Sequence, residues 1–225
     1  MDTLIVEKKN EVYITVDCDP NIQREISEFF TFYVPGYKFM PAFRNRMWDG
    51  KIRLYSQKTK EIYFGLYPYI IAFAKERGYH IVSGKDVEVD NKVNKEVVTK
   101  FSNSLGQKFE ARDYQIDAIY HSLKYNRALL LSPTASGKSF IIYSLIRYYS
   151  HLIKDEPNNR ILLIVPTTSL VEQMYSDFQS YGWNVKKNCH RLYSGYSNQT
   201  DKRVLISTWQ SLYKLPKKYF EQFGV

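Results

Sequence analysis

The segment from Leu129 to Ser139 constrains the fold more than any other part of the sequence. An apolar run, Leu129–Leu131, precedes a short loop of small residues, a Gly-Lys-Ser triplet and an amphipathic stretch. This order predicts a strand, a phosphate-binding loop and a helix, because small side chains let backbone amides approach phosphate oxygens and the helix adds its positive N-terminal end. The alternative is an ordinary strand–turn–helix with a surface lysine.

The loop predicts ATP and Mg²⁺ as cofactors. We assign the catalytic roles to Lys138, whose ammonium would reach the β- and γ-phosphates, and to Ser139, whose hydroxyl would bind Mg²⁺. Ser132 stands where the usual loop pattern begins with glycine. The expected nucleotide-binding residues of the loop are Thr134, Ala135, Ser136, Gly137, Lys138 and Ser139.

Composition and charge narrow the class of protein. The 225 residues are enough for one or two domains with their own cores. No apolar stretch approaches the roughly 20 residues that span a bilayer, and the first eight residues do not resemble a signal peptide. Cys18 and Cys189 are expected to be free thiols in a reducing compartment, the cytoplasm. The net charge of +9 favours an anionic partner.

Residues 1–84 are predicted to form a small α+β domain. Alternating hydrophobicity predicts a strand at 11–17, and apolar residues at helical spacing predict a helix at 21–31. Further strands are expected at 51–55, 61–64 and 79–82, and a helix at 67–77 that ends at Gly78. The polar stretch 85–108 is expected to be a linker with room for one short helix.

Residues 109–225 alternate between helices and strands, which predicts an α/β domain with a parallel sheet. The expected helices lie at 113–124, 138–150 and 169–180, and the expected strands at 127–131, 161–165 and 204–207.

A segment upstream of the loop is suited to bind a nucleobase. The amide of Gln115 can donate to a ring nitrogen of adenine and accept from its exocyclic amine, as Asn and Gln do on adenine in DNA. Phe109 is a candidate for stacking on the base, and Arg112 belongs to the same nucleotide-binding segment. A plain helix surface would explain these residues equally well.

A basic patch lies within the first domain. Residues 37–60 hold seven Lys and Arg against one acid, whereas the rest of residues 1–100 holds nine basic and thirteen acidic residues. A local basic patch with aromatic residues is typical of a nucleic-acid-binding surface. The residues expected to bind nucleic acid are Arg44, Arg46, Lys51 and Trp48, although Trp48 is equally well explained as a core anchor.

Four segments together resemble the motifs of superfamily 2 helicases. They are 112–115, the phosphate-binding loop 132–139, the strand end 165–168 and the strand end 208–210, in the order and spacing of that family. Residues 32–54 and 219–224 further resemble the recombination helicases of T-even-type phages, so the resemblance covers nearly the whole chain.

The resemblance implies an ATP-dependent DNA helicase. Residues 109–225 would be the first part of its RecA-like motor domain. In the family, threonine hydroxyls and helix N-terminal amides at two strand ends hold DNA phosphates, which implies contacts from Pro166, Thr167, Thr168 and Thr208. Capped helices are the alternative explanation of these threonines. The implied substrates are branched or single-stranded DNA and RNA–DNA hybrids, bound by a monomer in the host cytoplasm.

The family's acidic motif II and second motor domain would follow Val225. We therefore expect this chain to be an N-terminal fragment that does not hydrolyse ATP by itself. A non-catalytic nucleic-acid-binding module with a vestigial or regulatory nucleotide site is the alternative. A P-loop kinase is disfavoured, because it would leave Gln115 and the two threonine-bearing strand ends unexplained.

Overall fold

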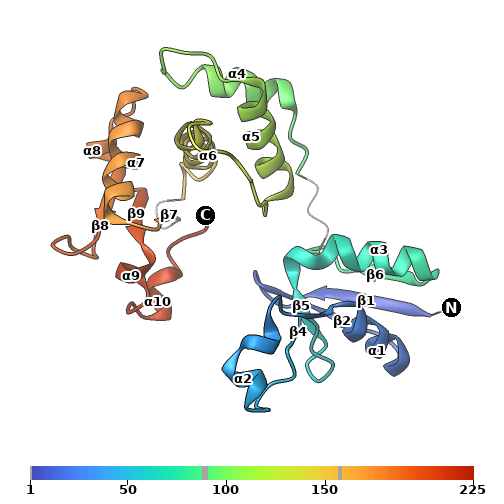
Figure 1. The fold of residues 1–225 in the computed structure, drawn as a ribbon. Coiled ribbons are helices and arrows are strands. Elements are labelled where there is room, and N and C mark those ends of the chain that lie inside the picture. Colours follow the sequence, from blue (N-terminus) through green and yellow to red (C-terminus); the bar gives the residue numbers. More distant parts are fainter. Residues whose placement is uncertain (1, 88–90, 157–158) are drawn as a thin grey trace. The chain divides into compact units, whose positions relative to one another are not determined.

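The computed structural model describes residues 2–87, 91–156 and 159–225. It divides into unit 1, residues 1–89, and unit 2, residues 90–225 (Figure 1). Among the described residues, no helix is both long enough and apolar enough to cross a membrane.

Unit 1 is built on a four-stranded sheet with the order β5-β2-β1-β6. Its strands are β1 (Thr3–Lys8), β2 (Tyr13–Asp17), β5 (Glu61–Tyr63) and β6 (His80–Ser83). Only β6 runs parallel to its neighbour, β1, and the other pairs are antiparallel. Alternate strand residues, including Leu4, Val6 and Ile14, are fully buried because successive side chains point to opposite faces of a strand.

Two helices, α1 (Pro20–Phe29) and α3 (Tyr67–Arg77), complete this core. The helices contact each other through Phe29 and Phe73, whose ring centroids are 5.2 Å apart. Asp19 begins α1 by accepting a hydrogen bond from the amide of Asn21 at 2.8 Å. The chain leaves α3 at Gly78 in a left-handed conformation, φ +71°, so the predicted end of this helix is confirmed.

An excursion from this sheet, residues 34–50, forms a basic knuckle (Figure 1). It is closed by the antiparallel pair β3 (Thr31–Tyr33) and β4 (Lys51–Arg53), and it contains the short helices η1 (Tyr37–Phe39) and α2 (Pro41–Arg44). A second 3-10 turn, η2 (Phe64–Leu66), leads into α3. At Gly50, φ is +80°, and an added Cβ would meet Tyr37 Cδ2 at 2.2 Å, so this closure requires glycine.

Unit 2 has a parallel sheet with the order β7-β9-β8. The strands are β7 (Ile161–Val165), β8 (Cys189–Leu192) and β9 (Val204–Thr208). The helices are α4 (Lys95–Asn103), α5 (Asp113–Tyr125), α6 (Lys138–Leu152), α7 (Thr168–Ser180), α8 (Val185–Asn188), α9 (Trp209–Leu212) and α10 (Lys217–Phe220). Val165 pairs with Thr208, so the carboxyl ends of β7 and β9 lie side by side. The predicted α/β architecture is confirmed.

The prediction of a strand at 127–131 is wrong. The segment is not assigned as a strand, and the side chains of Leu129 and Leu131 are 84% and 89% exposed. A strand is held by hydrogen bonds to a neighbouring strand, and none of the strands in the described part of unit 2 pairs with this segment. An apolar pattern alone therefore did not determine the local structure.

The predicted linker, 85–108, contains one short helix, for which the prediction left room. Helix α4 lies within it and packs on α5, with Val98 buried beside Ile119 and Leu123. Leu105 is also buried, in the main core of unit 2. Residues 88–90 lie outside the described residues. Polar residues dominate 85–108, so the sequence predicts a linker. The apolar side chains that anchor α4 are few.

Candidate nucleotide and nucleic-acid sites

The phosphate-binding loop has a backbone and close contacts that favour small residues. Gly137 has a φ of +79° at the N-cap of α6, and an added Cβ would meet Gln115 Nε2 at 2.3 Å. Ala135 also has a positive φ, +64°. The hydroxyls of Ser132 and Ser136 form a hydrogen bond across the loop. These contacts explain the small residues that the sequence places before Lys138.

Lys138 and Ser139 both have partners within the protein. The Lys138 ammonium donates to the carbonyl oxygens of Ser132 at 3.1 Å and Pro133 at 2.7 Å. The Ser139 hydroxyl lies 2.9 Å from the phenolic oxygen of Tyr181. Burial raises the pKa of Tyr181 further above its ordinary value, which already keeps the phenol protonated at neutral pH. The Lys138 ammonium thus already lies across the loop, where a phosphate would offer it stronger acceptors.

Gln115 links α5 to the loop rather than facing open solvent. The side chain is buried; its Oε1 accepts from the Arg112 amide at 3.0 Å, and its Nε2 donates to the Ser136 carbonyl at 3.1 Å. The Tyr114 hydroxyl donates to the same carbonyl at 3.0 Å, and Arg112 Nη1 donates to that hydroxyl at 3.2 Å. The recognition of adenine by Gln115 remains a prediction. In this structure the Gln115 side chain binds the Arg112 amide, at the start of α5, and the Ser136 carbonyl of the loop.

Two exposed features lie next to the loop: the Phe109 ring and an open cavity. Phe109 is exposed, and its ring packs edge-on against Phe140 at 5.0 Å and Tyr181 at 5.8 Å. A separate open cavity of about 640 Å³ lies between α5 and the loop. Its lining includes Arg112, Tyr114, Thr134, Ala135 and Ser136. Arg112 and the first part of the loop therefore line one cavity.

The residues present fit a nucleoside triphosphate with Mg²⁺. Helix α6 has 15 residues and begins at Lys138, so the amides of Lys138 and Ser139 precede its first backbone hydrogen bond and can bind phosphate. The next amide, that of Phe140, already donates to the Gly137 carbonyl at 3.0 Å. Among the described residues, no group of three or more His, Cys, Asp or Glu side chains could hold a metal ion. A Mg²⁺ ion would therefore be bound by phosphate oxygens of the nucleotide, by water and by the Ser139 hydroxyl.

The strand ends bring only some of the predicted DNA-binding residues to the surface. Pro166, Thr167 and Thr168 are exposed after β7. Thr167 accepts a hydrogen bond from the Leu170 amide at 3.3 Å and so caps α7. Thr208 is only 4% exposed, and its hydroxyl lies 3.0 Å from that of Ser211. The helix-capping explanation therefore has direct support at Thr167, and Thr208 offers little surface to a ligand.

An exposed aromatic pair at the end of β9 escaped the sequence reasoning. Trp209 and Tyr213 are both exposed, and their ring centroids lie 5.8 Å apart. Trp209 follows Thr208 directly, beside the carboxyl end of β7, and Tyr213 lies four residues further along the chain. The spacing of four residues in a helix, which puts both rings on one face, is the signal that could have identified them.

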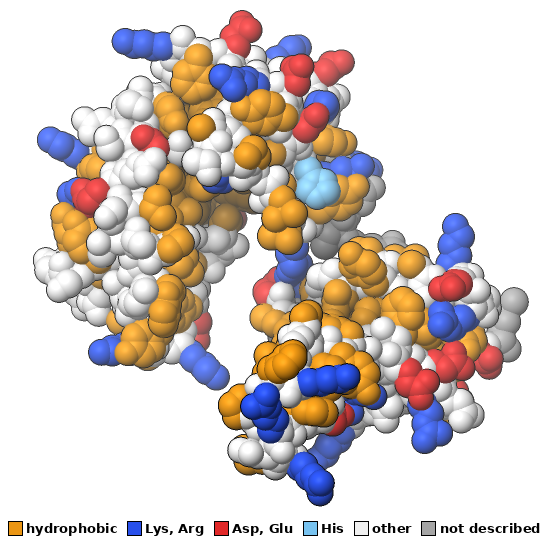
Figure 2. Space-filling view, in the orientation of Figure 1, with side chains coloured by type: hydrophobic (Ala, Val, Ile, Leu, Met, Phe, Trp, Pro, Cys, Tyr) orange, Lys and Arg blue, Asp and Glu red, His pale blue; other side chains and the backbone are white. Residues whose placement is uncertain are grey.

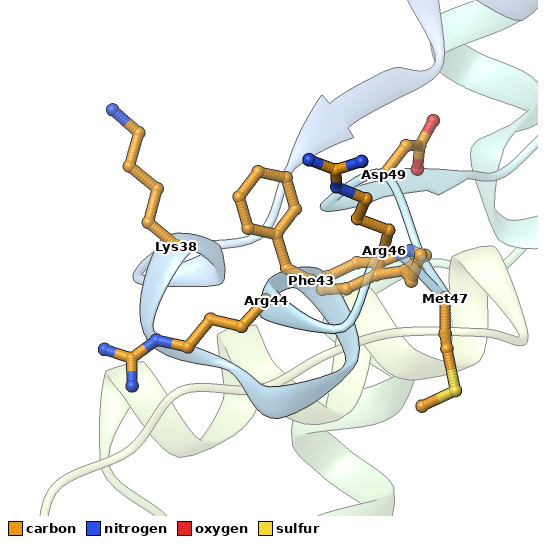
Figure 3. Close-up of a pocket in the computed structure, with 7 residues that line it drawn as sticks. Lys38, Phe43, Arg44, Arg46, Met47 and Asp49 are labelled. Carbon is orange, nitrogen blue, oxygen red and sulfur yellow. The ribbon is translucent and has the colours of Figure 1, made fainter.

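The knuckle brings most of the predicted basic patch together. An open pocket of about 590 Å³ is lined by Lys38, Phe43, Arg44, Arg46, Met47, Trp48 and Asp49 (Figure 3). Figure 2 shows basic and hydrophobic side chains gathered over α2, with acidic side chains concentrated elsewhere on unit 1. The Trp48 indole donates to the Lys51 carbonyl at 2.8 Å, so this half-buried ring anchors the turn as well as lining the pocket.

Lys51 faces a different part of the surface. Its ammonium lies 4.9 Å from the ring centroid of Tyr33. Both residues line a smaller cavity of about 320 Å³, which does not include Arg44 or Arg46. The structure thus joins Arg44, Arg46 and Trp48 in one pocket and separates Lys51 from them.

Each unit of the chain matches a known protein family. The family model "Type III restriction enzyme, res subunit" matches residues 108–224, and the model "DNA helicase UvsW, N-terminal" matches residues 5–84. The ATP-dependent DNA helicase uvsW of Enterobacteria phage T4 is 34% identical over 223 residues, which are 95% of this chain and 43% of that protein. The chain thus spans less than half the length of this curated relative.

Solved structures of the T4 protein are similar over the whole chain. Two structures of the bacteriophage T4 UvsW helicase each give a TM-score of 0.84 and cover 100% of this chain. Their identities are 31% and 32%, and the matched parts are 81% and 46% of those chains. The chain belongs to the superfamily 2 helicases that carry the res-subunit type of RecA-like domain, and it joins that domain to a UvsW-type N-terminal domain.

Proposed function

We propose that this protein is the nucleotide-binding and DNA-binding part of an ATP-dependent helicase that acts on branched recombination and replication intermediates. Single-stranded DNA and RNA–DNA hybrids are the further substrates that we propose. The observation that carries the proposal is the loop itself, in which Gly137, Lys138 and Ser139 open a 15-residue helix. The T4 relative, described as an ATP-dependent DNA helicase, supports the same reading.

Each loop residue has a role that follows from its chemistry. The amides at the start of α6 would bind the phosphates, and the Lys138 ammonium would exchange its carbonyl partners for phosphate oxygens. The Ser139 hydroxyl would hold Mg²⁺, which neutralises phosphate charge when bound. Phe109 and Arg112 would contact the nucleoside. Because catalysis of phosphoryl transfer rests on positioning and charge neutralisation, we expect hydrolysis to need the acidic motif II and the second motor domain of the family.

Nucleotide binding tests the loop assignment directly. Lys138→Ala should weaken the binding of a fluorescent ATP analogue about tenfold or more, because a charged hydrogen bond to phosphate is lost. Lys154→Ala removes an exposed lysine outside the loop and should leave the affinity unchanged. Equal affinities for the Lys138→Ala variant and the unaltered chain would show that the loop does not bind nucleotide.

A chimera tests the motor function. Residues 1–225 would replace the matching part of the T4 relative, whose length exceeds that of this chain. We expect DNA-stimulated ATP hydrolysis and unwinding of a branched duplex by the chimera, and loss of both in its Lys138→Ala form. Residues 1–225 alone should hydrolyse ATP only near background.

The second candidate is a nucleic-acid-binding module with a regulatory nucleotide site. One observation favours it: Lys138 and Gln115 are both occupied by partners within the protein. A chimera that binds branched DNA and ATP but does not hydrolyse ATP would support this second function. We further propose that the protein acts as a monomer, and in the host cytoplasm because its relative is encoded by a phage.

A further inference from the structure

Phe39 and Met47 are the two most exposed large apolar side chains of the basic knuckle. Phe39, at the end of η1, is 76% exposed, and Met47, after α2, is 75% exposed. Met47 lines the pocket and projects away from Lys38 and Arg44 in the view of Figure 3. Neither residue belongs to the core cluster of unit 1. Both residues belong to the same short excursion as Lys38, Arg44 and Arg46, so this segment offers both apolar and basic side chains to a ligand.

The knuckle is held in shape from inside. The Tyr37 ring stacks on Tyr33 and meets Phe43 edge-on, with both centroid separations at 4.7 Å. The Met47 amide donates to the Ala42 carbonyl at 2.9 Å, which closes the turn after α2. A surface that is ordered before binding loses less conformational entropy when a ligand arrives. The exposed side chains therefore belong to a segment whose conformation is already held by internal contacts.

The charges of the knuckle favour a polyanion. Among the described residues, Lys38, Arg44 and Arg46 form no ion pair with an acid. Asp49, the acid in the pocket lining, is paired with Arg53. The hydrogen bond from Arg53 lowers the pKa of Asp49, which therefore remains an anion engaged with that arginine. The three free cations can thus bind phosphates without competition from Asp49.

We propose that the knuckle binds unpaired nucleotides, with Phe39 and Met47 packed against exposed bases while Lys38, Arg44 and Arg46 hold the flanking phosphates. The proposal rests on the nucleic-acid-binding function proposed above and adds the structural class of its ligand. An aromatic ring and a polarisable thioether pack well against the flat face of any base. In a duplex those faces are stacked on one another, so only the phosphates would remain available.

The test measures binding of the full chain to three labelled ligands by fluorescence anisotropy. They are a single strand, an abasic strand with the same phosphates, and a blunt duplex of equal length. Phe39→Ala combined with Met47→Ala should weaken single-strand binding about tenfold. It should leave abasic and duplex affinities and the salt dependence unchanged. The matched control is Tyr69→Ala, which removes an exposed aromatic residue on α3 and should change none of these values.

A second pair of variants separates this proposal from the nucleic-acid-binding function itself. Arg44→Gln combined with Arg46→Gln should weaken all three ligands and flatten the salt dependence. If only the arginine variant has an effect, the knuckle binds phosphates and the proposal about bases is wrong. If neither variant has an effect, the knuckle does not bind nucleic acid, and the prediction that Arg44 and Arg46 contribute to DNA binding is also wrong.

The fluorescence of a base analogue tests the contact between Phe39 and a base independently. A strand that carries 2-aminopurine should change its fluorescence on binding to the unaltered chain, because packing against a side chain alters the stacking of the base. The change should be lost with Phe39→Ala even at protein concentrations that saturate the strand. An undiminished change in this variant would overturn the contact between Phe39 and the base. Thermal melting of each variant should match that of the unaltered chain, since both apolar side chains are exposed.

Discussion

The phenolic oxygen of Tyr181 lies 2.9 Å from the hydroxyl oxygen of Ser139, the residue expected to bind Mg²⁺. Tyr181 follows α7 directly, and its ring also packs against Phe109 and Phe140. One side chain therefore contacts both the proposed metal-binding hydroxyl and the proposed base-stacking ring. If the Ser139 hydroxyl is the donor in this hydrogen bond, the lone pairs of the Ser139 oxygen remain free to bind a cation.

Tyr181→Phe should therefore weaken the Mg²⁺-dependent part of nucleotide binding severalfold. The ring contacts with Phe109 and Phe140 are kept, and only the hydrogen bond to Ser139 is lost. The measurement compares the affinity for an ATP analogue in Mg²⁺ with the affinity in EDTA. An equal loss in both conditions would assign Tyr181 a purely structural role. Tyr120→Phe, in the middle of α5, is the control.

Gly137→Ala should abolish nucleotide binding and destabilise unit 2. The new Cβ would meet Gln115 Nε2 at 2.3 Å, and a φ of +79° is strained for alanine. Gly65→Ala is the matched control, because an added Cβ there meets nothing within 4 Å and φ is not positive. Thermal melting and nucleotide titration distinguish the two variants. A Gly137→Ala protein that binds nucleotide normally would contradict the loop geometry.

Gln115→Ala should cost about 1–3 kcal/mol of stability, because it leaves the Arg112 amide without its side-chain acceptor inside the structure. If Gln115 also reads adenine, the variant loses its preference for ATP over GTP in a competition assay. Loss of stability with an unchanged preference would restrict Gln115 to its role between α5 and the loop. Gln107, whose amide donates to the Ser102 carbonyl, provides a control for a general effect of amide loss.

The sequence predicts most clearly those features that depend on local backbone chemistry. Asp19 and Gly78 mark helix ends through a side-chain cap and a positive φ, and both were recognisable as residue types. The small residues around Gly137 likewise predict the loop. Strand pairing depends on partners far away in the sequence. No pattern in the sequence therefore indicated that β1 pairs with β6, and the apolar run at 127–131 led to the wrong prediction of a strand.

The site residues divide in the same way. The pocket that joins Arg44, Arg46 and Trp48 was predictable because these residues lie within one short segment. The bond between Ser139 and Tyr181 spans 42 residues, and no pattern in the sequence indicates it. The burial of Thr208 depends on its place at the end of the central strand, with a neighbour on each side. Such properties follow from tertiary packing rather than from residue type.

Glu172 should give unit 2 a component of acid sensitivity. Its carboxylate accepts hydrogen bonds from Tyr193 at 2.6 Å and Arg191 at 2.5 Å, and these lower its pKa below the ordinary value of 4.5. A lowered pKa in the folded state contributes stability above pH 4.5 that is lost as the pH falls through the folded value. The effect should be about 1 kcal/mol or less, because the side chain is 43% exposed.

Glu172→Gln should remove this component, so that stability measured by urea unfolding becomes less dependent on pH below 4.5. The comparison uses the difference between the variant and the unaltered chain at each pH. A constant difference across the acid range would show that the carboxylate charge contributes nothing there. Tyr193→Phe should act in the same direction with a smaller effect, because the Arg191 partner remains.

Arg46→Gly should separate stability from nucleic-acid binding. Arg46 has a φ of +58° at the turn after α2, a left-handed conformation that costs a non-glycine residue roughly 1–2 kcal/mol. Glycine removes that strain but makes the unfolded chain more flexible, so we expect stability to be unchanged or slightly increased. Binding of every nucleic acid should weaken, and the salt dependence should fall by about one unit of slope.

Lys60→Gly is the matched control for Arg46→Gly. Lys60 has the same φ of +58°, but its ammonium is paired with Asp17 at 2.6 Å, so it has less positive charge to offer a phosphate. We expect a similar relief of strain with little change in DNA affinity or in its salt dependence. Thermal melting and anisotropy titrations at several salt concentrations measure both quantities. Equal losses of affinity in the two variants would show that net charge, rather than the knuckle pocket, governs binding. A loss confined to Arg46→Gly would mean that a charge held in a strained turn is used for nucleic-acid binding.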